Sequence, residues 1–252
     1  MGEFRAVDAD AHYLEAISKI AEYVEEPWRS RLTSDGETEG DAPADIFPSS
    51  TGDRAVYGRI RRDDISWPNE TQAEDITTMM DHLGVDATVL LSQVMLSFAR
   101  IGAADERQRV LANGYTDYML EEVVDPEKGI YTMLPMPYSD PEESVELIER
   151  AGDEDGIVGV CMVTAGAEPP LGHRRYDVIY EACEEHDLPV VFHSGGAGLD
   201  EFNIKGYEKF IETHTLGFLQ ANQAQLTSLV IQGVPEKFPD LDIVFQESGI
   251  FW

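Results

Sequence analysis

The chain has 252 residues, 42% of them hydrophobic, with 49 acidic against 18 basic side chains and a formal charge of -31. This length and apolar fraction suffice for one large or two small domains with a buried core. The charge excludes nucleic-acid binding, because so negative a surface repels phosphate, and no run approaches the roughly 18 consecutive apolar residues of a membrane-spanning helix.

Charge and cysteine content together indicate a cellular setting. An acidic excess with few lysines is typical of proteins in salt-accumulating cells, where salt screens the repulsion between like charges. Cys161 and Cys183 are the two cysteines, which argues against a disulfide scaffold, and the first residues lack the basic and apolar regions of a signal peptide. We therefore expect a halophilic, cytoplasmic protein. Its negative charge is then an adaptation to a solvent of high salt concentration and gives no information about the substrate.

The N-terminal part of the chain combines two predicted elements with a long polar stretch. A strand is predicted over residues 4–10, where it leads into Asp10-Ala-His12, and a weakly amphipathic helix over about 14–32. Residues 33–68 are rich in Gly, Pro, Asp and Ser and predict a loop insertion, in which 54–60 could form a short hairpin arm. Such a loop could cover an active site and set its specificity.

From residue 70 onward, predicted helices and strands alternate regularly. Helices are predicted over about 70–83, 104–124, 140–152, 175–187 and 207–232. Strands are predicted over 87–92, 130–136, 157–163, 188–193 and 241–247. Most of these strands are near-continuous Val, Ile and Leu runs, which is typical of parallel strands buried on both faces. We therefore expect an α/β protein with six strands.

Two α/β architectures compete for this pattern. A doubly wound nucleotide-binding sheet normally carries a Gly-x-Gly-x-x-Gly turn after an early strand; here the Gly-rich HSGGAG sequence (193–198) follows the fifth strand. A (β/α)8 TIM barrel gathers polar residues at the carboxyl ends of its strands, where Asp10, His12 and His193 are predicted to lie. The pattern favours the barrel, in an incomplete form with about six of its eight units.

Asp10 and His12 are the first candidate metal ligands. Side chains two residues apart point to the same face of a strand, so both can enter one barrel mouth and reach a single ion. His193 ends the fifth strand at the equivalent edge. Imidazole nitrogens and carboxylate oxygens bind zinc, manganese or iron, and three protein ligands with an open position form a catalytic site. The alternative is that Asp10 caps a turn and both histidines are hydrogen-bonded core residues.

Six stretches that cover nearly the whole chain carry a family resemblance. They are VDADAHYLE (7–15), MMDHLGVDATVLLS (79–92), LPMPYSDPEESVELIERA (134–151), GIVGVCM (156–162), HDLPVVFHSG (186–195) and FPDLDIVFQESGIFW (238–252). In this order they resemble the amidohydrolase-related family of the amidohydrolase superfamily, the group that includes γ-resorcylate decarboxylase and aminocarboxymuconate-semialdehyde decarboxylase. The resemblance implies a distorted (β/α)8 barrel with one divalent metal ion, with zinc expected first and manganese or iron as alternatives.

The resemblance also implies a ligand set. In the family, the ligands are a His, Glu or Asp two residues before a His on strand 1, a His that ends strand 5 and an Asp that ends strand 8. Asp10 and His12 look like the strand-1 pair, and His193 looks like the strand-5 ligand. Glu15 falls where many relatives have a Glu after that pair, and we interpret it as a residue that orders the loop.

The sequence departs from the family pattern at two places. Many relatives end strand 6 in a His, whereas this chain has Gln246-Glu247-Ser248-Gly249. A carboxylate at that point can orient water or take a proton, so Glu247 is the candidate catalytic acid/base. The resemblance ends at Trp252, so strands 7 and 8, and the Asp that ends strand 8 in the family, have no counterpart.

Two functional hypotheses follow. In the first, residues 1–252 form a single domain, a metal-dependent amidohydrolase-family enzyme that hydrolyses or decarboxylates a small carboxylate or aromatic acid. In the second, the chain is a truncated, catalytically impaired barrel that needs a partner chain or the missing C-terminal segment. Open sheet edges invite pairing with another chain, which leaves a homo-oligomer open as well.

Overall fold

The computed structural model describes residues 5–13, 15, 17–33, 73–93, 95–100, 106–195 and 210–249. Apart from Thr33, the predicted loop insertion at 33–68 lies outside these residues, as does its hairpin arm at 54–60. All six predicted strands are present. They are β1 (Val7–Tyr13), β2 (Ala87–Ser92), β3 (Ile130–Pro135), β4 (Ile157–Val163), β5 (Val190–His193) and β6 (Ile243–Gln246).

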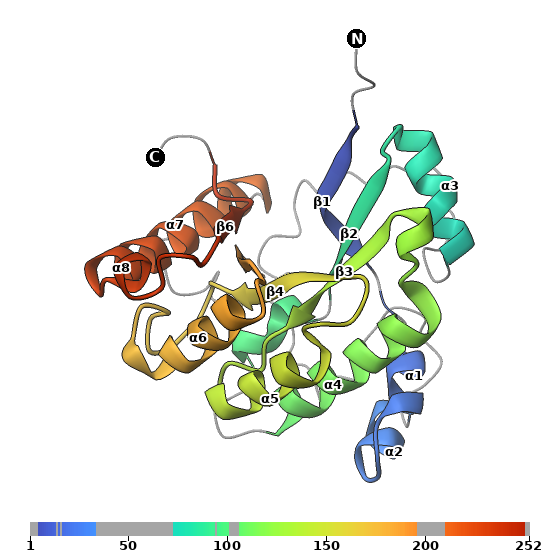
Figure 1. The fold of residues 1–252 in the computed structure, drawn as a ribbon, viewed down its shortest axis with the longest axis horizontal. Coiled ribbons are helices and arrows are strands. Elements are labelled where there is room, and N and C mark those ends of the chain that lie inside the picture. The colour runs from blue at the N-terminus through green and yellow to red at the C-terminus, as the bar shows by residue number, and fades with distance from the viewer. Residues whose placement is uncertain are drawn as a thin grey trace.

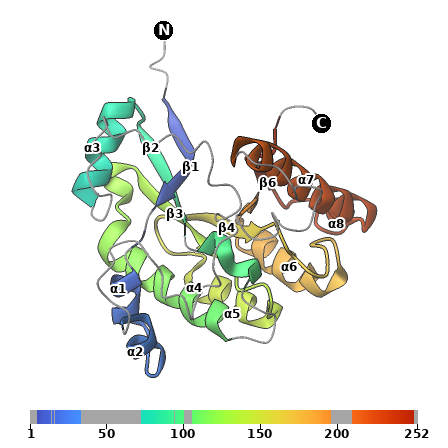
Figure 2. The same cartoon turned by 180° about the vertical axis from the view of Figure 1, so that it is seen from behind.

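The strands form one parallel sheet in the order β1-β2-β3-β4-β5-β6. Each crossover therefore moves one strand further in the same direction. Because such crossovers are right-handed, the connecting helices all lie on one face of the sheet, as they do in a barrel and not in a doubly wound sheet. Figure 1 shows this outer layer of helices around the sheet, and Figure 2 shows it from behind. The predicted α/β fold class, an incomplete (β/α)8 barrel, is confirmed.

The helices follow the predicted alternation. They are α1 (Ile17–Ile20), α2 (Trp28–Thr33), α3 (Ala73–Leu83), α4 (Arg107–Tyr118), α5 (Pro141–Ala151), α6 (Asp177–Glu185), α7 (Phe210–Ile231) and α8 (Val234–Lys237). Shorter turns are η1 (Ala21–Tyr23), η3 (Met95–Arg100), η5 (Pro126–Lys128) and η6 (Arg174–Tyr176), and a π-helical turn, η4 (Met119–Val123), extends α4. None of the helices described here has both the length and the apolar character needed to cross a bilayer.

Two boundaries near the N-terminus differ from the prediction. The helix predicted over 14–32 is divided into α1, η1 and α2, with Pro27 directly before α2. Proline has no backbone N–H to donate and disfavours helical geometry in the residue before it, so one continuous helix cannot form there. The first strand continues past Asp10 to Tyr13, because Tyr13 still pairs with Ser92 of β2. Asp10 and His12 therefore lie inside β1.

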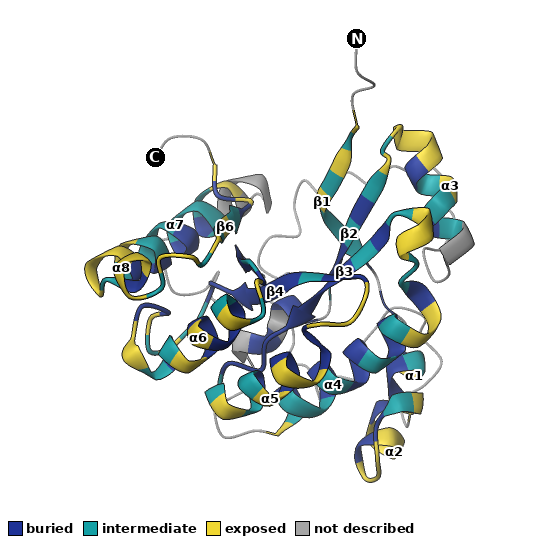
Figure 3. Cartoon of the chain, in the orientation of Figure 1, coloured by how far each residue is buried: buried dark blue, intermediate teal, exposed yellow. Residues whose placement is uncertain are grey.

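Burial follows the position of each strand in the sheet. Strands β3, β4 and β5 are buried at nearly every residue, whereas β1 and β6 are partly exposed. Figure 3 shows the buried layer between the central strands and the outer helices. On the other face, η3 packs against the carboxyl ends of β2, β3 and β4, where Met95, Leu96 and Phe98 meet residues of the three strands.

The contact between η3 and the end of β5 requires a glycine. A Cβ on Gly195 would lie 2.3 Å from the Leu96 carbonyl oxygen, which is closer than atoms can approach. Gly195 follows His193 by two residues, so the close packing of η3 also fixes the chain just beyond this candidate ligand.

Gly114 in α4 provides a test of how tightly the N-terminal segment packs. A Cβ at this position would lie 2.5 Å from Val24 Cγ1 and 3.1 Å from Ile20 Cγ2. Gly-to-Ala changes in helices usually stabilise by about 1 kcal/mol, but overpacking costs about 1–3 kcal/mol. We expect Gly114→Ala to lower the free energy of unfolding, as measured by urea denaturation. In a Val24→Ala background the same change should be neutral or stabilising; a loss of equal size in both backgrounds would contradict the packing assignment.

Candidate metal centre

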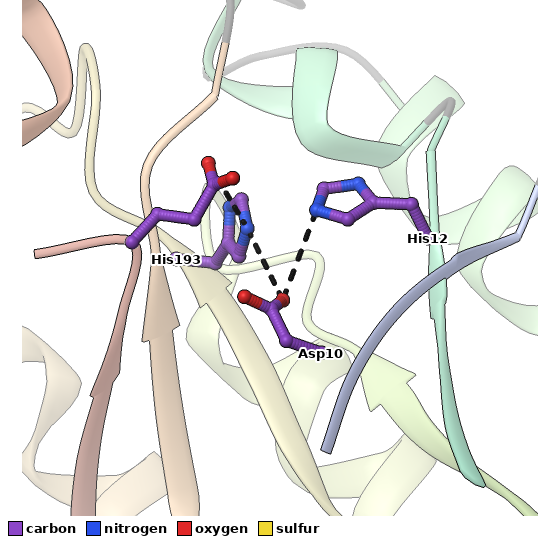
Figure 4. A group of neighbouring side chains, drawn as sticks. Asp10, His12 and His193 are labelled. Carbon is purple, nitrogen blue, oxygen red and sulfur yellow. Dashed lines mark ion pairs between the residues drawn. The ribbon is translucent and has the colours of Figure 1, made fainter. Parts of the chain in front are cut away.

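Four side chains singled out from the sequence come together at the carboxyl edge of the sheet. Asp10 and His12 come from β1, His193 is the last residue of β5, and Glu247 directly follows β6. One potential ligand atom from each lies within 4.8 Å of the other three. Figure 4 shows the Asp10 carboxylate directed toward both histidines. The four are brought together because parallel strands end at the same edge of a sheet.

The distances suit a single ion. Asp10 Oδ1 lies 3.7 Å from His12 Nε2 and 3.5 Å from His193 Nε2. Glu247 Oε2 lies 3.6 Å from His193 Nε2. Atoms that bind one divalent ion at about 2.1 Å are separated from one another by about 3 to 4 Å. The spacing of these atoms is therefore close to the spacing of ligands around one ion.

Hydrogen bonds set the orientation of both imidazole rings. His193 Nδ1 contacts the Ser194 carbonyl oxygen, and His12 Nδ1 lies 2.8 Å from Gln93 Oε1. Carbonyl and amide oxygens only accept hydrogen bonds, so in each neutral ring Nδ1 carries the proton. The Nε2 lone pairs of both rings are then directed toward Asp10. Orientation of a ligating imidazole through its second nitrogen is usual at metal sites.

Two polar atoms at the centre of the cluster are buried without a hydrogen-bond partner among the described residues. Asp10 Oδ1 and His193 Nε2 have no hydrogen-bond partner among the described residues, and His193 is fully buried. A buried polar group without a partner is costly, and two carboxylates in one cluster repel each other. A divalent cation would satisfy both atoms and balance the charges of Asp10 and Glu247. The donor set of imidazoles and carboxylates thus fits a bound divalent ion.

A bulge in β1 and a contact across the sheet place Asp10. Between Asp8 and Ala11, β1 has one residue more than the paired segment of β2. Bulges are frequent beside active sites, where they redirect a side chain. Gln246 Nε2 donates to the Ala9 carbonyl oxygen, so the end of β6 contacts β1 directly. Through this contact Asp10 lies close to His193, the last residue of β5, and to Glu247, which follows β6.

Glu247 is held in an unfavourable backbone conformation. Its φ is 49°, in the left-handed region, which costs a residue other than glycine roughly 1–2 kcal/mol. Fully buried Asn222 of α7 holds the residues on either side of it, since Nδ2 donates to the Gln246 carbonyl oxygen at 2.8 Å and to Ser248 Oγ at 2.7 Å. Asn222 Oδ1 accepts from Thr164 Oγ1 at 2.6 Å, which ties this turn to the end of β4.

Glu15 lies outside the cluster but supports it. The side chain is 2% exposed, accepts a hydrogen bond from Ser92 Oγ, and accepts another from the Gln93 backbone N–H at 3.2 Å. These contacts tie the segment after β1 to the end of β2, the geometry that a loop-ordering residue would have.

Cys161 of β4 lies near the cluster without joining it. Burial, and to a lesser extent the negative charge of Asp10, raises the pKa of its thiol to about 12. The thiol therefore stays protonated near neutral pH, when it is neither a thiolate ligand nor a nucleophile. Cys161 and Cys183 are both free and buried.

Two residues of the site were not singled out from the sequence. Gln93 follows β2 directly, and its position immediately after a predicted strand was the available signal. Asn222 lies in the middle of α7, in a sequence of mixed polar and apolar residues, where no local pattern distinguishes a buried amide from an exposed one. Its role becomes visible once α7 is packed against β4 and β6.

Comparison with known proteins gives a family and a fold. A family model described as amidohydrolase matches residues 7–252. No curated protein matches the sequence. Among solved structures, an amidohydrolase from Mycobacterium avium subsp. paratuberculosis is similar with a TM-score of 0.74 at 19% identity, over 100% of this chain and 75% of that one.

Two further structures are decarboxylases. The 5-carboxyvanillate decarboxylase of Novosphingobium aromaticivorans, complexed with manganese and 4-hydroxy-3-methoxy-5-nitrobenzoic acid, has a TM-score of 0.63 at 18% identity, over 96% of this chain and 64% of that one. A dihydroxybenzoic acid decarboxylase from a Polaromonas species, with bound manganese and 2-nitroresorcinol, has a TM-score of 0.55 at 14% identity, over 96% and 65%. The chain thus spans about two thirds of the length of these two proteins.

The Asn222 contacts predict a large effect of one amide on stability. Asn222→Ala would remove one hydrogen bond each from the Thr164 hydroxyl and the Gln246 carbonyl in a buried site, which costs about 1–3 kcal/mol. The Thr164 hydroxyl would keep its contact with the His193 carbonyl oxygen at 3.3 Å, and the Gln246 carbonyl its contact with Ser248 Oγ at 3.0 Å. Urea denaturation of the two proteins measures the difference. Gln223→Ala, at the next, half-buried position of α7, is the matched control and should change stability by less than about 0.5 kcal/mol. A loss below about 1 kcal/mol for Asn222→Ala would contradict the assigned network.

Proposed function

The chain belongs to the amidohydrolase family, and from that premise we propose that it is a metal-dependent enzyme that decarboxylates or hydrolyses a small carboxylate or aromatic acid. One observation carries the proposal, the convergence of Asp10, His12, His193 and Glu247 at the carboxyl edge of the sheet. In barrel enzymes this edge is where active sites are found.

The four residues are assigned two roles. Asp10, His12 and His193 hold the ion, since both imidazoles direct Nε2 toward Asp10 Oδ1. Zinc, manganese and iron all suit this donor set, and the manganese bound in the two decarboxylases puts manganese beside zinc as the ion to test. A bound divalent ion would supply positive charge for a substrate carboxylate and a neighbouring oxygen. Glu247 is left to carry protons.

Decarboxylation is the reaction that we favour. The bond between the ring carbon and the carboxyl group breaks, CO2 leaves, and the ring carbon takes a proton in its place. Glu247 Oε2 is assigned to deliver that proton, and its backbone is fixed by Asn222 on both sides. Similarity to two aromatic-acid decarboxylases supports a hydroxylated aromatic acid as the substrate.

Hydrolysis is the second candidate, supported by the description of the family model as amidohydrolase. In this reaction Glu247 would take a proton from the attacking water and pass it to the leaving group. The same four residues serve both reactions, so the products distinguish them.

The third candidate is that activity requires additional chain. The sequence spans 64% to 75% of the three solved structures compared above. Completion by further residues, by a partner chain or by a second copy would supply the remaining strands of a barrel. The strongly acidic composition supports a cytoplasmic setting at high salt for each of these candidates.

Ion binding separates the two roles that we assign. We expect the purified chain to bind Mn²⁺ or Zn²⁺ at one ion per chain, as measured by calorimetry and metal analysis. His193→Ala removes a ligand and should weaken binding at least about 100-fold, whereas Glu247→Gln should change it less than about threefold. His82→Ala, on the exposed end of α3, is the control. Equal losses in His193→Ala and Glu247→Gln would make Glu247 a ligand and overturn its assignment as proton carrier.

Activity tests the reaction itself. We expect 2,6-dihydroxybenzoate or a 5-carboxyvanillate-like acid to release CO2 in the presence of Mn²⁺ or Zn²⁺ at high salt. Chelation of the ion should abolish the release, and Glu247→Gln should lower kcat about 10²–10⁴-fold, the usual contribution of general acid–base catalysis. If the chain instead cleaves ester or amide substrates and releases no CO2, the decarboxylase proposal is wrong and the hydrolase proposal is supported. Turnover that appears only when C-terminal sequence or a partner is added would support the third candidate.

A further inference from the structure

Gln93 contacts a candidate ligand from a distant part of the chain. It follows β2 directly, and its Oε1 lies 2.8 Å from His12 Nδ1, although the two residues are 81 positions apart. The contact is made on the side of the His12 ring opposite to the Asp10 carboxylate, which lies 3.7 Å from Nε2. Among the hydrogen bonds of the described residues, the one that joins Gln93 to the cluster is made with His12 Nδ1.

The backbone of Gln93 is anchored. Its N–H donates to the Tyr13 carbonyl oxygen at 3.0 Å and to Glu15 Oε2 at 3.2 Å. The preceding residue, Ser92, donates to the other Glu15 oxygen and accepts from the Met95 N–H at 3.0 Å. Since Glu15 and Ser92 are buried, the backbone of Gln93 is held in place while its side-chain amide contacts His12.

The two histidines differ in how firmly they are held. His193 is completely buried, and its Nδ1 bonds to the backbone carbonyl of Ser194, a partner that no substitution removes. The His12 side chain is 31% exposed, so packing restrains it less. Without an acceptor at Nδ1, the neutral His12 ring can carry its proton on Nε2 or rotate, and either change removes the lone pair that faces Asp10.

We propose that Gln93 is a positioning residue that keeps the proton of His12 on Nδ1 and thereby sets the affinity of the site for a divalent ion. The proposal rests on the metal centre that we propose for this chain. Partners that orient metal-bound histidines typically change metal affinity 10- to 100-fold when they are removed. Gln93 therefore acts on the ion through His12 and without contact to it.

Two substitutions and a double-variant cycle test the proposal on the full chain. Gln93→Leu keeps the size of the side chain and removes the acceptor, whereas Gln93→Glu keeps an acceptor with the same reach. Titration of Mn²⁺ by calorimetry should show a 10- to 100-fold loss of affinity for Gln93→Leu and at least wild-type affinity for Gln93→Glu. Gln232→Leu, at an exposed position beyond α7, is the control and should change affinity less than about twofold.

The cycle shows whether the effect passes through His12. In a His12→Ala background, Gln93→Leu should change Mn²⁺ affinity less than about twofold, because the residue through which it acts is absent. A loss of similar size with and without His12 would overturn the proposal, as would Gln93→Leu with wild-type affinity in the native background. Equal loss in Gln93→Glu and Gln93→Leu would also overturn it.

A readout without metal separates this proposal from the proposed function. Long-range ¹H–¹⁵N spectra of the ion-free chain report which nitrogen of His12 carries the proton. We expect Nδ1–H in the wild type and in Gln93→Glu, and a mixture dominated by Nε2–H in Gln93→Leu. If the wild type binds no Mn²⁺, the proposed function fails. The part of the proposal that then remains is that Gln93 determines which nitrogen of His12 carries the proton. An unchanged tautomer in Gln93→Leu would overturn the role of Gln93 itself.

Discussion

The arrangement of the site depends on one carboxylate oxygen and one imidazole nitrogen that are buried side by side without a hydrogen-bond partner. Asp10 Oδ1 and His193 Nε2 lie 3.5 Å apart, and neither has a hydrogen-bond partner in the described part of the chain. Burial of such groups is unfavourable unless a charge compensates them. The hydrogen bonds of the two imidazole rings direct their Nε2 lone pairs into the centre, which is the arrangement that a bound cation would require.

The topology of the sheet makes this arrangement accessible. Because the strands are all parallel, each strand ends at the same edge, and residues separated by more than 180 positions meet there. The contact between Gln246 and Ala9 brings the first and last described strands together at that edge. Asn222 then fixes the turn after β6 from the helix side. Strand order, one cross-sheet contact and one buried amide thus determine where Glu247 lies.

Most of the fold was predictable because its signals are local. Apolar runs identify the strands, Asp140 and Pro141 mark the start of α5, and Gly84 ends α3 in the left-handed conformation. Asp10, His12 and His193 stand out because each lies at or next to the carboxyl end of a strand predicted from the sequence. The bulge in β1, the conformation of Glu247 and the contacts of Gln93 and Asn222 were not predictable, because each depends on residues brought together only by tertiary packing.

The left-handed backbone at Glu247 has a consequence for laboratory evolution. Glycine adopts this conformation without strain, so a library screened only for resistance to heat should enrich glycine at that position. A library screened for turnover should retain the carboxylate despite its strain. Sequencing codon 247 in the survivors of the two screens would therefore show whether the glutamate lowers thermal stability while it is required for turnover.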